Sequence, residues 1–210
     1  MTSRTKVWLV SALIYGAFVF WYTDLNGPIT EEELQDWKSS MQANGSRPER
    51  IAYFEKFFRD DTGRQFLMLN AIDLNENPPQ VEGADANETA DQLMARYLEH
   101  MLSEFFWRAC HPVITGDAVF TAFDLAGIEG AEVWDQGAFV RYRSRRDIMQ
   151  IISNPATIEN HRFKVAALEK TIAYPVEPNF YLGDLRLLFG LLILAVTALL
   201  DSLLLNRRQS

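Results

Sequence analysis

Two long apolar segments stand near the two ends of this 210-residue chain. Residues 7–22 read VWLVSALIYGAFVFWY, and residues 187–205 read LLFGLLILAVTALLDSLLL, with one carboxylate at Asp201. At about 1.5 Å per residue, helices of these lengths reach roughly 24 and 28 Å, close to the ~30 Å hydrocarbon core of a bilayer. The pattern therefore predicts two transmembrane helices, over residues 7–24 and 183–205, with a polar domain between them.

The first apolar segment also resembles a secretory signal peptide, because Arg4 and Lys6 precede it. No cleavage site built from small residues follows, since the segment continues through Phe20, Trp21 and Tyr22. We therefore favour an uncleaved anchor, with a cleaved signal peptide as the alternative.

Basic residues mark the outer flank of each expected span: Arg4, Lys6, Arg207 and Arg208. Lysine and arginine near the ends of a span favour the cytoplasmic side. This bias predicts cytoplasmic tails over residues 1–6 and 206–210, with the main domain in the periplasm or outside the cell. The expected location is the inner (cytoplasmic) membrane, and membrane lipid is the first expected partner.

The carboxylate of Asp201 falls inside the second span. It could be a functional group that contacts a partner within the membrane. The simpler interpretation, which we favour, is a carboxylate near the interface that Arg207 or Arg208 neutralises.

The chain is acidic and carries no recognisable cofactor or metal motif. It has 20 Lys and Arg against 28 Asp and Glu, a formal net charge of −8. Such a surface repels phosphate backbones, which argues against nucleic acid as a partner. One cysteine, Cys110, allows no internal disulfide, and His100, His111 and His161 lack metal-ligand spacing. We therefore predict neither a cofactor nor a metal.

Residues 25–63 predict a helical extension ahead of the main domain. Thr30 and Glu33 form a capping-box pattern that begins one helix. Pro48, shortly after Ser46, suits the first turn of a second helix. Apolar residues recur at helical spacing in both segments, so each helix is expected to bury one side.

Residues 64–178 alternate strand and helix patterns in the order β-α-β-β-α-β. The expected elements are strands at 65–74, around 113–114 and 119–123, at 132–143 and at 171–176, with helices at 88–108 and from Ser144 to about Lys170, interrupted at Asn154-Pro155. This order predicts an α+β domain of the ferredoxin-like type, a four-stranded antiparallel sheet with two helices on one face.

The helices of such a domain cover only one face of its sheet, yet several of these strands are apolar on both sides. The second face therefore needs a cover of its own. A second copy of the chain is the favoured cover, which predicts a homodimer or a subunit of a membrane protein complex.

Short motifs in the same region resemble those of a known family. They are FLMLN at 66–70, WD at 134–135 with VRYRSR at 140–145, the segment 151–155 ending in Asn154-Pro155, and His161-Arg162 followed by AALE at 166–169. In this order they resemble a bacterial family of domains of unknown function within the dimeric α/β-barrel superfamily. The resemblance covers about residues 48–178.

The resemblance implies a ferredoxin-like monomer that pairs sheet to sheet into a barrel, but it implies no reaction. The wider superfamily includes cofactor-less monooxygenases, isomerases and haem-handling enzymes. This chain departs from the family in its two apolar spans and in the added helix near Thr30. Both departures favour a membrane-tethered accessory domain.

The first candidate for a catalytic site is the pair His161 and Arg162, because histidine transfers protons near neutral pH and arginine can hold an anion. The alternative is a structural pair on a helix surface, and we favour it. Asn70 lies within an apolar strand, where its amide could orient a ligand or, as we favour, tie down a loop.

A local basic cluster is the second candidate site, with Tyr142 as a ligand-stacking candidate that we otherwise expect in the core. The cluster comprises Arg141, Arg143, Arg145 and Arg146. These arginines could bind an anionic ligand, with Arg141 as the binding candidate. They could equally pair with Glu132, Asp135 or Asp147.

Two functions remain open from the sequence. The favoured one is a membrane-anchored binding or assembly module outside the cytoplasm. The alternative is a small cofactor-less enzyme, monooxygenase-like or isomerase-like, that acts on an apolar compound. A cavity containing His161 and Arg162 would favour the enzyme, whereas a filled core with exposed apolar patches would favour assembly.

Overall fold

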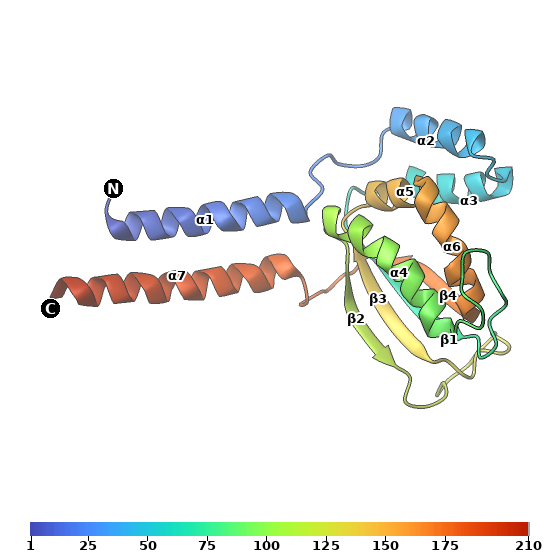
Figure 1. Cartoon of the computed structure of the whole chain (residues 1–210). Helices are drawn as coiled ribbons and strands as arrows, with labels where there is room; N and C mark the ends of the chain where they lie inside the picture. Colours follow the sequence, from blue (N-terminus) through green and yellow to red (C-terminus); the bar gives the residue numbers. More distant parts are fainter. Residues whose placement is uncertain (210) are drawn as a thin grey trace. The chain divides into compact units, whose positions relative to one another are not determined.

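The computed structural model describes residues 1–209, with side chains described through residue 206 (Figure 1). The chain forms two compact units. Asn26–Glu177 make up one unit, and Met1–Leu25 with the chain from Pro178 onward make up the other.

A four-stranded antiparallel sheet organises the larger unit. Its strands are β1 (Phe66–Leu74), β2 (His111–Asp117), β3 (Gln136–Tyr142) and β4 (Leu168–Val176), in the spatial order β2-β3-β1-β4. Helix α4 (Ala90–Trp107) connects β1 to β2, and helices α5 (Arg145–Ser153) and α6 (Pro155–Ala167) connect β3 to β4. The predicted α+β class with an antiparallel sheet is confirmed, and this strand order is ferredoxin-like.

Side-chain caps explain where the helices of this unit begin. Thr89 and Gln92 form a capping box at the start of α4, and the Ser144 hydroxyl accepts from the Asp147 backbone N–H at the start of α5. Asn154 caps α6, and Pro155 occupies its first turn, where no intrahelical N–H bond is lost. These local signals separate α5 from α6.

The hydrophobic core lies on one face of the sheet. Phe66 and Met68 of β1 and Val140 and Tyr142 of β3 belong to one core cluster with residues of α4 and α5. Side chains alternate between faces along a strand, and the register pairs Phe66 with Tyr142 and Met68 with Val140, so all four share a face. Their rings and methyl groups therefore pack against the helices.

The opposite face of the sheet is apolar but much less covered. It carries Leu69, Phe139 and Ile172, which are partly buried. Tyr174 is 47 % exposed and Ile114 is 64 % exposed. This uncovered sheet face matches the sequence-based expectation that the sheet is apolar on both sides.

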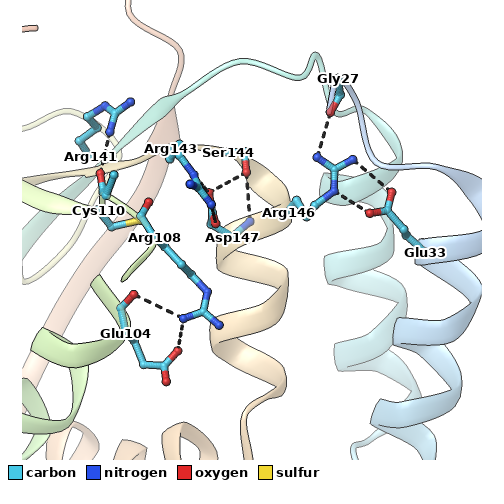
Figure 2. Close-up of polar contacts among 11 residues, drawn as sticks. Gly27, Glu33, Glu104, Arg108, Cys110, Arg141, Arg143, Ser144, Arg146 and Asp147 are labelled. Carbon is cyan, nitrogen blue, oxygen red and sulfur yellow. Dashed lines mark hydrogen bonds and ion pairs between the residues drawn. The ribbon is translucent and has the colours of Figure 1, made fainter. Parts of the chain in front are cut away.

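Two N-terminal helices, α2 (Glu31–Ala43) and α3 (Pro48–Arg59), pack against each other and against α5. Trp37 of α2 meets Phe58 of α3 edge to face, with ring centroids 5.0 Å apart. Arg146 of α5 donates to Glu33 at 2.6 Å and to the Gly27 carbonyl at 3.1 Å (Figure 2). The Arg146 guanidinium lowers the pKa of Glu33 to about 2.

Part of the predicted strand pattern is wrong. Residues 119–123 lie in a loop, because β2 ends at Asp117. Val119 is 98 % exposed and Phe123 is 93 % exposed, so this apolar segment has no core to pack against. Strand β3 begins at Gln136 rather than near residue 132, and α6 ends at Ala167 rather than near residue 170.

The smaller unit contains helices α1 (Ser3–Tyr22) and α7 (Leu185–Gln209). Both are long and apolar enough to cross a membrane, and they pack against each other. Helix α1 begins at Ser3 and α7 continues to Gln209, so both helices extend into the segments assigned to the tails.

The partner of Asp201 differs from the predicted one. Its carboxylate accepts two bonds from the Arg4 guanidinium, at 2.5 and 2.7 Å. Because Arg4 lies near the start of α1 and Asp201 near the end of α7, the pair joins the two terminal helices. The side chains of Arg207 and Arg208 lie outside the described residues.

Candidate functional site

A cavity of about 700 Å³ opens on the larger unit, between the core face of the sheet and the helices α3, α4, α5 and α6. Strand residues Met68, Asn70 and Ala173 form its floor. Its wall includes the exposed residues Tyr53, Ile158 and Ala173, so the cavity is open to solvent. It falls within the usual range for small-molecule sites.

The wall of the cavity is mainly aromatic and aliphatic. Its aromatic members are Tyr53, Phe54, Phe57, Phe58, Tyr97 and Tyr142. Helix α3 supplies four of these six because its aromatic residues recur three or four positions apart and therefore share a helix side. The added helix α3 thus makes one wall of a site that the sheet and the other helices leave open.

A few polar side chains interrupt this apolar wall. Asn70 on β1 donates its amide to the Met68 carbonyl at 3.0 Å, within its own strand and not to a loop as the favoured prediction had it. Tyr97, Tyr142 and His161 form no hydrogen bond with the other described residues, although all three line the cavity. These groups are available to a bound molecule.

Burial keeps the two phenols protonated. It raises the pKa of Tyr97 to about 12 and raises the pKa of Tyr142 well above its ordinary value. At neutral pH both side chains are therefore neutral hydroxyls that can donate a hydrogen bond.

His161 is held in its neutral form. Burial lowers the pKa of the imidazole, and the positive charges of Lys164 and Arg50 lower it further. The ring also meets Tyr97 edge to face, with centroids 6.4 Å apart. A neutral imidazole offers one donor and one acceptor to the cavity.

The basic cluster is mostly used for internal ion pairs (Figure 2). Arg143 donates to Asp147 at 2.6 Å, and Arg146 donates to Glu33. Arg145 lines the cavity, but it donates to Glu177 at 2.8 Å and to the Phe57 carbonyl at 2.7 Å. Pairing with acids is therefore the better interpretation, with Asp147 as the expected partner and with Glu33 and Glu177 as partners that the sequence did not suggest.

The structure brings together three of the five sequence-predicted site residues. His161, Asn70 and Tyr142 all line the cavity. Arg162 does not line it and donates instead to Glu159 at 3.3 Å. His161 therefore faces the cavity, whereas Arg162 lies against Gly83 of the loop between β1 and α4.

Arg141 also lies away from the cavity. It is completely buried on the opposite side of the sheet from Tyr142. Its guanidinium donates to Gln65 at 2.7 Å and to the Ala109 carbonyl at 2.7 Å. Ala109 has a left-handed backbone (φ 50°) just after α4, so Arg141 stabilises the turn into β2.

Sequence reasoning missed Tyr97, Arg50 and Lys164 as site residues. The spacing of Lys164 three positions after His161 places both on one side of α6, which is a signal that the sequence does contain. Nothing in the sequence shows that Arg50 of α3 reaches the same space, because that requires the packing of α3 over the sheet.

No model of a known protein family matches the chain, and no curated protein matches it either. A crystal structure of a protein of unknown function from Rhodopseudomonas palustris is similar, with 22 % identity and a TM-score of 0.50 over 62 % of this chain and 94 % of that one. The methylated form of the same protein gives 21 % identity and a TM-score of 0.52, over 63 % and 93 % of the two chains.

A hydroxynitrile lyase from Passiflora edulis also matches, at 13 % identity over 56 % of this chain and 98 % of that one, but its TM-score of 0.35 is too low to carry an argument. The two stronger likenesses show the fold of the larger unit. They carry no reaction or ligand to this chain.

Proposed function

We propose that this protein is a membrane-anchored binding domain that takes up an apolar organic molecule in the cavity of its larger unit. The observation that carries the proposal is the cavity of about 700 Å³ itself. Its wall is mainly aromatic and aliphatic, and the uncharged polar groups Asn70, Tyr97, Tyr142 and His161 are placed to orient a ligand. This is the usual composition of a small-molecule site.

The binding reading is preferred to catalysis because the cavity lacks a recognisable catalytic pair. Among the described residues, no carboxylate lies within hydrogen-bond distance of His161. Burial raises the pKa of the Cys110 thiol to about 12, so this cysteine is a poor nucleophile at neutral pH.

A small enzyme remains the second candidate, and the position of His161 is the observation that favours it. A neutral imidazole that faces an apolar cavity can accept a proton from a bound substrate. The two candidates differ in one measurable respect: a binding domain releases its ligand unchanged, whereas an enzyme releases a different compound.

The binding proposal predicts that filling the cavity abolishes uptake of an apolar probe. Ala173 lines the cavity from β4 and is not itself tightly packed, so Ala173→Trp should fill the space without disrupting the core. We expect the full-length protein in non-ionic detergent to bind the neutral dye N-phenyl-naphthylamine saturably, and the variant to bind it at least 10-fold more weakly.

The matched control is Val165→Trp, which places the same side chain at a residue of α6 that is 59 % exposed and outside the cavity. This variant should bind the dye as tightly as the unchanged protein does. Because dye dissolved in micelles contributes equally to every protein measured in the same detergent, the comparison also corrects for it. Equal dye binding by all three proteins would contradict the proposed site.

We also propose that α1 and α7 both cross the inner membrane, with both termini in the cytoplasm and the cavity-bearing unit on the far side. The basic residues Arg4 and Lys6 in the first turn of α1 support this orientation. The pairing of Arg4 with Asp201 supports it too, since it holds the start of α1 beside the end of α7.

This topology predicts the behaviour of reporter fusions. Reporters that fluoresce only in the cytoplasm should be active at both chain ends. A phosphatase that folds only outside the cytoplasm should be active when inserted at Gly83, in the loop between β1 and α4. A cytoplasmic signal at Gly83, or an outside signal at either end, would contradict the proposed topology.

We further propose that two copies pair through the uncovered sheet face. The exposed apolar residues Tyr174 and Ile114 on that face support self-association. In this arrangement the cavity lies on the helix side of each sheet and remains open in the dimer.

A further inference from the structure

The cavity is positively charged in a protein that is negatively charged overall. The chain has a formal net charge of −8, yet the cavity wall contains Arg50, Lys56, Arg145 and Lys164 against one acid, Asp60. From the composition of the whole chain, more acidic than basic residues would be expected in the wall.

The cations differ in whether they have acidic partners. Arg145 pairs with Glu177 at 2.8 Å. Within residues 1–206, whose side chains are described, Arg50, Lys56 and Lys164 form no ion pair with a carboxylate. Arg50 and Lys56 are exposed to water, whereas Lys164 is partly buried, so Lys164 is the cation that neither a carboxylate nor full exposure to water compensates.

Arg50 and Lys164 line the same cavity as His161, from two different helices. Lys164 lies three residues after His161 on α6, and its Nζ is 5.6 Å from the centroid of the Tyr97 ring. The Arg50 guanidinium comes from α3 and lies 5.8 Å from the centroid of the Phe54 ring. The charges of both lower the pKa of the His161 imidazole, in agreement with their place in the wall of the same cavity.

Of the three cations without an ion pair, Lys164 gives the clearest indication of the charge of the ligand. Its ammonium is partly withdrawn from water and contacts an aromatic face, and this burial lowers its pKa. An ammonium that is desolvated without a carboxylate costs free energy unless another group compensates for it. A bound anion would supply that compensation.

We propose that the cavity binds an apolar carboxylic acid, with its carboxylate between Arg50, His161 and Lys164 and its apolar body against the aromatic wall. This inference rests on the proposed binding function and adds the charge of the ligand. The two cations attract the carboxylate, His161 donates a hydrogen bond from its N–H, and the apolar wall removes the hydrocarbon from water.

The test compares two probes of equal chain length, dodecanoate and dodecanol, in competition with N-phenyl-naphthylamine on the full-length protein in non-ionic detergent. We expect dodecanoate to bind at least 10-fold more tightly than dodecanol. Lys164→Met and Arg50→Met should each weaken dodecanoate binding about 10-fold, and they should leave dodecanol binding unchanged, because they keep apolar bulk and remove only charge.

Arg162→Met is the matched control, because Arg162 lies on the same helix but outside the cavity. This variant should bind both probes like the unchanged protein. Raising the pH should weaken dodecanoate binding only, since Lys164 loses its proton at a lower pH than an ordinary lysine.

The possible outcomes separate this inference from the function on which it rests. Equal affinity for the two probes, with both blocked by Ala173→Trp, would overturn the anionic ligand and leave the apolar site intact. Failure of the unchanged protein to bind either probe or the dye would overturn both. An equal loss of dodecanoate affinity in Arg162→Met and Lys164→Met would also overturn the specific carboxylate site.

Discussion

Asp147→Ala is expected to destabilise the larger unit by about 3 kcal/mol, because it removes one partner of a buried ion pair. The Asp147 side chain is 3 % exposed and accepts from Arg143 at 2.6 and 2.9 Å and from the Ser144 hydroxyl at 2.8 Å. Figure 2 shows both partners directed at this carboxylate. Its loss removes the carboxylate that accepts from Arg143 and from the Ser144 hydroxyl at the start of α5.

The measurement is thermal and urea unfolding of the full chain, followed by circular dichroism. For a domain of this size the loss corresponds to a fall in Tm of roughly 6–12 °C. The Tm of Asp147→Asn should lie between those of the unchanged protein and Asp147→Ala. The asparagine keeps an acceptor for the Ser144 hydroxyl but loses the charge that holds Arg143.

The matched control is an ion pair on the surface. Glu31 pairs with Arg59, and their side chains are 60 % and 49 % exposed. Glu31→Gln should leave the Tm unchanged within error, since solvent screens exposed pairs. If Asp147→Ala lowers the Tm no more than Glu31→Gln does, the buried network around Asp147 contributes nothing to stability.

The class and element order of the larger unit could be predicted because local signals determine them. The capping box at Thr89 sets the start of α4, and Asn154 followed by Pro155 separates α5 from α6. Such signals act within a few residues, so they are visible in a sequence. The antiparallel sheet then follows from the order of strands and helices.

The loop at residues 119–123 shows where local pattern is insufficient. Val119 and Phe123 have strand-like side chains, yet both are almost fully exposed. A strand requires a neighbour with which to pair, and the ladder between β2 and β3 extends only to Asp117 and Gln136. Beyond that point the described backbone bonds are scattered, from Ala118 to the Asp135 carbonyl and from Ala122 to the Glu132 carbonyl, and the exposed side chains gain nothing from burial, so strand propensity is overridden.

The candidate site could be predicted only in part, because neighbours in sequence point in different directions. His161 and Arg162 are consecutive on a helix, about 100° apart, so one faces the cavity and the other does not. Arg141 and Tyr142 are consecutive on a strand and lie on opposite faces. The pairing of residues into a site requires the packing of α3 over the sheet, which no local pattern contains.

The second large effect is expected at the uncovered sheet face, where Tyr174→Glu should convert a dimer into monomers. Tyr174 is 47 % exposed in a single copy, so the substitution has little effect on folding. In a symmetric pair the same residue is contributed twice, and two carboxylates are then buried without partners. We expect the Kd of the dimer to rise at least ~100-fold.

Native mass spectrometry and cross-linking of the full chain in mild detergent measure this change. Ile114→Glu, on the same face and 64 % exposed, should act in the same direction. Val165→Glu, on α6 and 59 % exposed, is the control and should remain dimeric. Equal dissociation by all three substitutions would mean that added negative charge, rather than this face, is responsible.

A monomeric unchanged protein would contradict pairing altogether. Dye binding in Tyr174→Glu distinguishes the two faces of the sheet, because the cavity lies on the helix side and Tyr174 on the other. We therefore expect the monomeric variant to bind N-phenyl-naphthylamine with unchanged affinity. Loss of both pairing and dye binding would instead show that the second copy is needed to keep the cavity open.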